Sequence, residues 1–137
     1  MKKLLLIVLA ALTLYSCADN TKEEKNLLND ILKVHDKLMD KDEVLMKNKS
    51  YLDSLLKLPA KDTSEKTNMK AISLKLVAAE QSMEDWMGKF QADMTGKSHD
   101  EVMKYYTAQK KQITSIDSQI NVAIRESGKY LSNHKIK

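Results

Sequence analysis

Apolar residues recur at helical spacing along three stretches of the chain. In residues 22–58 one column repeats every seven residues, a period typical of one buried face of a helix. Residues 62–94 carry two such columns, and residues 98–133 carry one longer stripe that Gln109 interrupts. The three sets are Ile31, Leu38, Leu45 and Leu52; Met69, Leu76, Met83 and Phe90 with Ile72, Ala79 and Trp86; and Val102, Tyr106, Ile113, Ile116, Ile120, Ala123 and Tyr130.

Start and stop signals stand between these stretches. Pro59 ends the first predicted helix, because proline lacks the N–H that a helix interior needs. The second helix is expected to end near Met94, with Gly96 as its left-handed cap. Two capping boxes, in which an acid follows the capping residue by three positions, predict the starts of the second and third helices: Asp62 with Glu65, and Ser98 with Glu101.

Three long helices joined by short loops predict an all-α, antiparallel up-down-up three-helix bundle, similar to a coiled coil. A chain with one proline and three glycines in 137 residues supports long helices. The bundle is expected to cover residues 22–133, with helices at about 22–58, 62–94 and 98–133, and residues 134–137 form a frayed tail.

The first residues predict a secretory signal. Lys2 and Lys3 precede an apolar run over residues 4–15, which is shorter than the ~20 residues that a membrane-spanning helix needs. A positive start, a short apolar run and then a small residue are typical of a cleaved signal peptide, here residues 1–16.

The chain has a single cysteine, and it directly follows this segment. Leu14, Ser16 and Cys17 resemble a bacterial lipobox, in which the cysteine becomes the lipid-modified first residue of the mature chain. Diacylglycerol and an acyl chain on Cys17 would anchor the protein stably, since two chains suffice, and residues 17–21 would form a short tether. The alternative is a buried free cysteine after an ordinary signal peptide.

Lys22, Glu23 and Glu24 follow the tether. This lysine and two acids resemble the lipoprotein export signal of the Bacteroidota, which implies the outer membrane, at its periplasmic or outer face. The same acids would also suit the first turn of a helix, where the helix dipole favours negative charge. Both interpretations can hold together.

The net charge of the chain does not indicate a particular kind of partner. Removing Lys2 and Lys3 with the signal leaves 21 of 23 basic residues against 19 acids, so the mature chain carries a net charge of +2. The two signs of charge are mixed along the sequence, as on a solvated helical surface. Nucleic acid is therefore not expected as a partner.

Methionine, histidine and aromatic residues gather at one level of the predicted bundle. A tight turn near residue 60 would set His35 level with Trp86 and Met39 level with Met83, while Trp86 would face Tyr106 on the third helix. Thioether and imidazole groups suit Cu(I), so one hypothesis is a soft-metal site made by His35, Met39, Met83 and Met87. The alternative is an ordinary core, because methionine fills irregular gaps and packs against aromatic rings.

No pattern in the sequence indicates catalysis. The chain has no nucleophile elbow and no glycine-rich phosphate loop. The expected function is therefore that of a non-enzymatic, membrane-anchored envelope lipoprotein, a helical structural or interaction module with a protein partner and no resident cofactor. The alternative is a Cu(I)-type metal-binding lipoprotein.

Two segments, Val34-His35-Asp36-Lys37-Leu38-Met39 and Met83-Glu84-Asp85-Trp86-Met87-Gly88-Lys89-Phe90, resemble signature segments of small Bacteroidota lipoproteins that carry the label "viral A-type inclusion protein". The resemblance extends over most of the mature chain. It implies a helical, membrane-anchored protein of the cell envelope, and it implies no activity.

Overall fold

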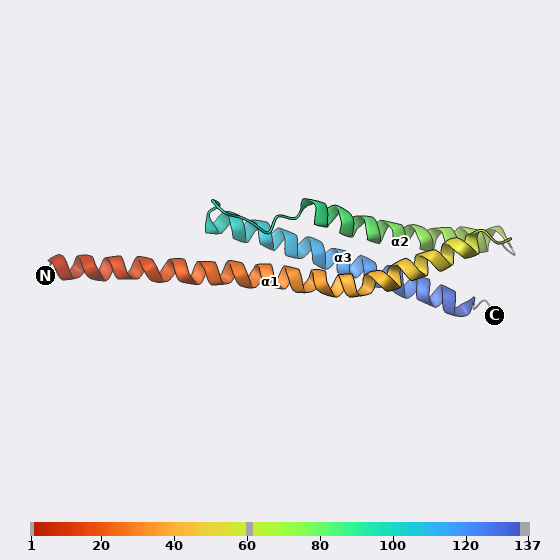
Figure 1. Ribbon diagram of the computed structural model, residues 1–137, viewed down its shortest axis with the longest axis horizontal. Helices are drawn as coiled ribbons and strands as arrows, with labels where there is room; N and C mark the ends of the chain where they lie inside the picture. The colour runs from red at the N-terminus through yellow and green to blue at the C-terminus, as the bar shows by residue number, and fades with distance from the viewer. Residues whose placement is uncertain (1, 60–61, 135–137) are drawn as a thin grey trace.

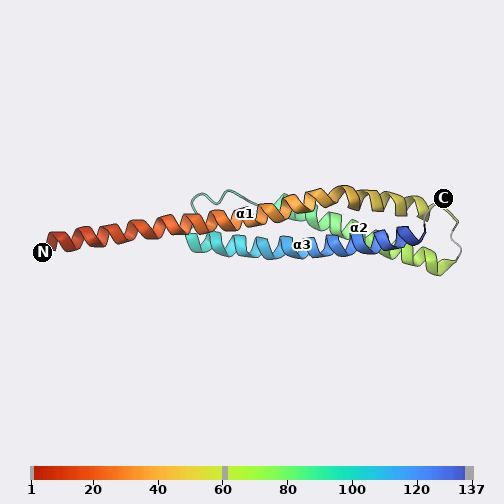
Figure 2. The same cartoon turned by 90° about the horizontal axis from the view of Figure 1, so that it is seen from below.

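The protein folds into three helices arranged up, down and up. The computed structural model describes the backbone of residues 2–59 and 62–134, and the side chains from residue 20 onward within those ranges. The helices are α1 (Lys2–Leu56), α2 (Thr63–Lys89) and α3 (His99–Asn133), and the described residues contain no strand. Each helix contacts the other two, and α1 and α3 run parallel with the most extensive contacts (Figures 1 and 2). The predicted all-α bundle is confirmed.

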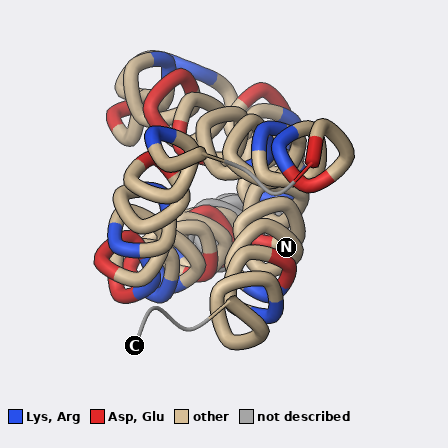
Figure 3. Tube along the Cα trace, turned by 90° about the vertical axis from the view of Figure 1, so that its right-hand side faces the viewer, with Lys and Arg blue, Asp and Glu red and all other residues tan. Residues whose placement is uncertain are grey.

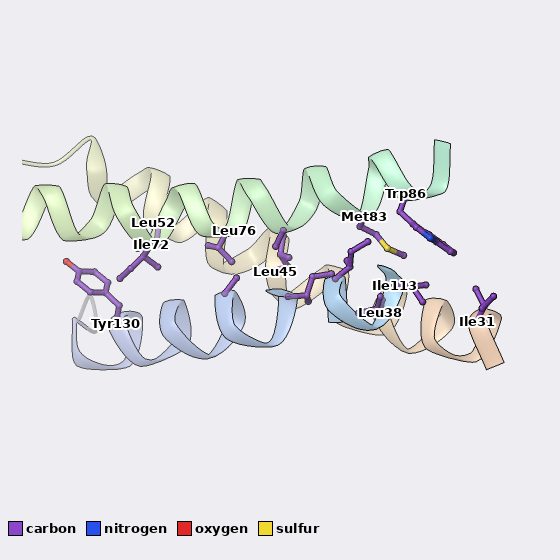
Figure 4. Close-up of a cluster of buried hydrophobic side chains, with 14 of the residues drawn as sticks. Ile31, Leu38, Leu45, Leu52, Ile72, Leu76, Met83, Trp86, Ile113 and Tyr130 are labelled. Atoms are coloured by element: carbon purple, nitrogen blue, oxygen red, sulfur yellow. The ribbon is translucent and has the colours of Figure 1, made fainter. Parts of the chain in front are cut away.

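The predicted columns form the core. On α1 the four seven-residue positions Ile31, Leu38, Leu45 and Leu52 are all buried. On α2 and α3 the predicted positions are buried too, except Phe90, which packs against the core from a partly exposed position. Figure 4 draws 14 of the buried side chains, which point into the space between the three helices, with Met83 and Trp86 of α2 toward one end and Tyr130 of α3 toward the other.

Helix α1 is longer than expected. The sequence predicts a helix beginning near residue 22, whereas α1 begins at Lys2 and passes without a break through residues 2–21. No proline or glycine occurs between Lys2 and Leu56, so nothing in the covalent chain interrupts the helical hydrogen bonds. Figure 1 shows the start of α1 projecting beyond the ends of the other two helices.

Helix α2 ends earlier than expected, and the prediction of residue 94 is wrong. Its cap is Phe90, whose backbone is extended with φ −72° and ψ 130°. Two tyrosines of α3 hold the chain beyond it. The Gln91 N–H donates to Tyr105 Oη at 2.8 Å, and Tyr106 Oη donates to the Ala92 carbonyl at 2.8 Å. These bonds replace the helical hydrogen bonds that residues 91 and 92 would otherwise make.

Gly96 is therefore not the cap of α2. It has a positive φ of 84° and lies in the turn that the hydrogen bond from Lys97 N to Met94 O closes at 3.0 Å. Glycine suits this position because it adopts the left-handed region without steric cost. The next helix starts as predicted, since Ser98 and Glu101 form a reciprocal capping box.

Ion pairs fix the parallel register of α1 and α3. Lys41 Nζ lies 2.6 Å from Asp117 Oδ1, and Lys110 Nζ lies 2.6 Å from Asp30 Oδ2. Partial burial opposes ionisation of Asp117, but the hydrogen bond from Lys41 and the charges of Lys41 and Lys37 outweigh it and lower the pKa of this carboxyl. Figure 3 shows both signs of charge interspersed around the outside of the bundle, without a face of one sign in that view.

One polar contact inside the bundle was not anticipated from the sequence. Ser127 is fully buried, and its hydroxyl donates to the Ala123 carbonyl at 2.7 Å. The same hydroxyl accepts a hydrogen bond from Asn48 Nδ2 at 2.9 Å. The contact joins α1 to α3 without leaving this hydroxyl unsatisfied.

Candidate functional site

The predicted lipobox lies on α1. The helix includes the backbone of Leu14, Ser16 and Cys17, but their side chains lie outside the described residues. Lipid attachment to Cys17 therefore stays a prediction. In the part of the chain that the structure describes, no helix is both long enough and apolar enough to cross a membrane.

The acids of the predicted export signal contact the start of α3. His99 Nδ1 lies 2.8 Å from Glu24 Oε1, and His99 Nε2 lies 3.8 Å from Glu23 Oε2. Lys22 is exposed. The two acids thus link α1 to α3 just after the predicted tether, a structural role that is compatible with an export signal.

The structure places His35 beside Trp86, as the register predicts. Their ring centroids are 6.0 Å apart, and His35 Nδ1 lies 3.2 Å from Asp36 Oδ1. Trp86 also stacks on Phe90 at 4.7 Å. The Trp86 Nε1 atom is buried without a hydrogen-bond partner among the described residues.

Tyr106 belongs to the same aromatic group but does not stack directly on Trp86. Phe90 stacks with Tyr105 at a centroid distance of 6.4 Å, and Tyr105 lies tilted against Tyr106 at 5.8 Å. Burial raises the pKa of the Tyr106 phenol, which keeps its O–H protonated as the donor to the chain after α2. The aromatic group therefore joins α2 to α3 and shapes the 90–98 connection.

Three of the four predicted metal ligands line one groove between α1 and α2. The groove has a volume of about 270 Å³. Met39, Met83 and Met87 line it, His35 does not, and a further methionine, Met46, does. Met83 is buried, while the other three methionine residues are 42–44% exposed.

The lining of this groove combines buried apolar residues with acidic residues. The buried residues Leu38, Leu45 and Ile120 line its inner part. Three acids also line it: Asp42, Glu80 and Glu84. No group of three or more His, Cys, Asp or Glu side chains that could hold a metal ion occurs among the described residues, so any soft-metal site here depends on the methionines.

A larger, polar groove lies at the other end of the bundle between α2 and α3. Its volume is about 730 Å³, and its lining includes Lys75, Glu126, Lys129, Tyr130 and His134. Lys75 Nζ lies 2.5 Å from Glu126 Oε2. This end is close to the turn after α1, since Leu58 and Pro59 line a small adjoining cavity with Tyr130 and His134.

Comparisons of the sequence with protein-family models and with curated proteins, and of the structure with solved structures, find no match.

Proposed function

We propose that the protein is a non-enzymatic lipoprotein of the bacterial cell envelope, anchored through lipid on Cys17, whose rigid bundle holds a protein-binding end away from the membrane. The observation that carries the proposal is the unbroken course of α1 from Cys17 into the core. A continuous helix transmits the position of its anchored end to the whole bundle.

The distances along α1 define the two ends. Thr21 lies four residues after Cys17, or about 6 Å along the helix, and Thr21 already lines a cavity of about 340 Å³ together with Thr95 and Lys97. The connection between α2 and α3 would therefore sit next to the lipid surface. Leu56 lies about 60 Å from Cys17 along the same helix, so the polar groove near Pro59 would face away from the membrane.

A protein partner fits the exposed end better than a small substrate. The groove there is open and mixed in charge, with a lysine and glutamate paired across it. The Pro59 loop, which lines the adjoining cavity, offers a further contact surface at this end. Substrate turnover by the purified protein would refute the non-enzymatic part of the proposal.

Lipid attachment is tested by labelling cells with a radioactive fatty acid and separating membranes from soluble protein. The parent chain should carry label and stay with the membrane, and Cys17→Ser should lose both properties. Ser16→Ala is the matched control, because alanine keeps a small residue before the cysteine and should preserve both. An unlabelled parent chain would refute the anchor.

Orientation is tested by energy transfer from a dye on the protein to acceptors on lipid headgroups. Lys97→Cys and Lys57→Cys place the dye at exposed positions near the two ends of the bundle. The dye at position 97 should transfer energy strongly and the dye at position 57 weakly. Equal transfer from both positions would show that the bundle lies flat or is flexibly tethered.

A further inference from the structure

We propose that the groove between α1 and α2 binds a soft monovalent cation, Cu(I) or Ag(I), through the thioether sulfurs of Met39, Met46, Met83 and Met87. This donor set replaces His35 of the sequence-based hypothesis with Met46. The proposal does not depend on lipid attachment, because every residue that it uses lies within the folded bundle.

The concentration of methionine in this groove is the first observation. The chain has eight methionines, and four of them line a single cavity of about 270 Å³. Met83 and Met87 are one turn apart on α2, and Met39 and Met46 are two turns apart on α1, so each pair shares one helix face. Two faces of neighbouring helices thus bring methionine side chains to one space.

The exposure of these residues is the second observation. Met39, Met46 and Met87 are 43%, 44% and 42% exposed, whereas Met83 is 7% exposed. Core filling accounts for Met83 but not for three half-exposed methionines around one opening. A thioether is a neutral, polarizable donor that favours Cu(I)-like ions over hard cations.

Charge around the groove favours a cation. Lys49 Nζ lies 2.6 Å from Glu80 Oε2, and the hydrogen bond with Glu80 raises the pKa of Lys49. Asp42 and Glu84 line the same groove, and the described part of the chain gives neither side chain a hydrogen bond or ion pair. The charge of Glu84 also acts on Lys49, but the lining contains three acids and no basic residue, and this balance of charge attracts a cation to neutral sulfur ligands.

The size of the groove favours an ion over a docked helix. At about 30 Å³ for each water molecule in the liquid, the cavity of about 270 Å³ has the volume of about nine waters, which accommodates an ion together with its thioether ligands and several waters. A partner helix is ~10–12 Å wide with its side chains and would need a longer furrow. His35 stays outside this space, with its ring against Trp86.

Cu(I) binding is tested by competition with a coloured Cu(I) chelator, with ascorbate as the reductant. The full-length chain should carry Cys17→Ser and be kept in mild detergent, because a free thiol at position 17 would itself bind Cu(I). This parent should bind one Cu(I) with a dissociation constant below ~1 μM. Weaker binding would overturn the proposal and leave the groove as packing or as a protein contact.

Two variants, each with three methionines replaced by leucine, test where Cu(I) binds. The first changes the half-exposed groove methionines to leucine: Met39→Leu, Met46→Leu and Met87→Leu. The second changes the three methionines outside the groove that follow the signal segment: Met69→Leu, Met94→Leu and Met103→Leu. Leucine keeps the volume close to that of methionine, so circular dichroism should show both variants folded.

In known metal sites, loss of a residue that only supports a ligand weakens metal binding by ~10-fold or more. Loss of the ligands themselves should weaken Cu(I) binding by at least as much. The groove variant should show that loss, and the control variant should bind within about twofold of the parent. Equal effects in both variants would overturn the assignment.

Methyl resonances give a readout that does not depend on any variant. With ¹³C-labelled methionine methyl groups, addition of Ag(I) should shift the signals of the four groove methionines. The signals of Met69, Met94 and Met103 should stay in place. Shifts spread evenly over all methionines would mean nonspecific thioether binding and would refute the site.

Discussion

Leu76 and Leu74 offer a direct test of the packing, because they carry the same side chain two residues apart on α2. Leu76 is 0% exposed in the core, and Leu74 is 67% exposed on the outer face of the helix. Alanine at either position removes the same atoms and changes helix propensity by the same small amount. Any difference between the two variants therefore measures tertiary burial alone.

The expected difference follows from the position of Leu76 among all three helices. Replacing a fully buried leucine by alanine loses transfer free energy and leaves a cavity, together about 3 kcal/mol. The exposed Leu74→Ala should change the free energy of unfolding by less than about 0.5 kcal/mol. For a folded unit of this size, about 3 kcal/mol corresponds to a fall in Tm of roughly 12 °C.

Chemical denaturation followed by circular dichroism at the helix band measures both values in the same full-length parent. The slope of the unfolding free energy against denaturant should stay unchanged, so that the shift in midpoint reports stability. A cost below about 1 kcal/mol for Leu76→Ala, or an equal cost for Leu74→Ala, would refute the assignment of the α2 core face.

Three further predictions concern the hydrogen bonds and ion pairs that hold the helices and their ends in place. Tyr105→Phe removes the acceptor of the Gln91 N–H, so hydrogen exchange at that amide should accelerate while exchange within the helix cores stays slow; unchanged exchange would contradict the role of this tyrosine. The lowered pKa of Asp117 stabilises the fold above the ordinary carboxylate range near pH 4, and this stabilisation disappears as the pH falls through the lowered pKa. Asp117→Asn should therefore be less stable than the parent at neutral pH, and the free energies of unfolding of the two proteins should converge in acid. A difference in unfolding free energy that stays constant with pH would contradict this role of Asp117. Ser98→Ala removes the cap of α3 and should cost about 1 kcal/mol, measured by thermal unfolding against the exposed mid-helix control Ser115→Ala, and equal losses would mean that the cap is unimportant.

Local patterns were enough to predict the helices and their buried faces. The seven-residue columns of α1 and α2, apart from Phe90, and the stripe of α3 are buried as expected, because helix periodicity alone decides which side chains share a face. The caps at Asp62 and Ser98 were also readable, since a capping side chain bonds to a backbone N–H only three residues away.

The sequence also predicts part of the candidate groove. The sequence predicts Met39, Met83 and Met87 as neighbours, because spacing on one helix and an antiparallel turn bring them together, and all three line the groove. Met46 was missed. A tight turn near residue 60 would set Lys49 level with Ile72, whereas Lys49 binds Glu80 and Asp53 accepts from Ser73 at 3.3 Å. The predicted register thus holds at His35 and Trp86 but not at Lys49 and Asp53, which are nearer the turn, and the groove includes Met46.

The remaining features depend on contacts between residues far apart in the chain. Helix α2 stops at Lys89 because Tyr105 and Tyr106, on another helix, bind the backbone beyond it. Periodicity and propensity describe a chain segment in isolation, and neither contains the hydrogen bond that a distant hydroxyl offers. Residue type and spacing therefore set which faces are apolar, while the packing of three helices against one another sets where α2 ends, which side chains of α1 and α2 pair and which methionines share a groove.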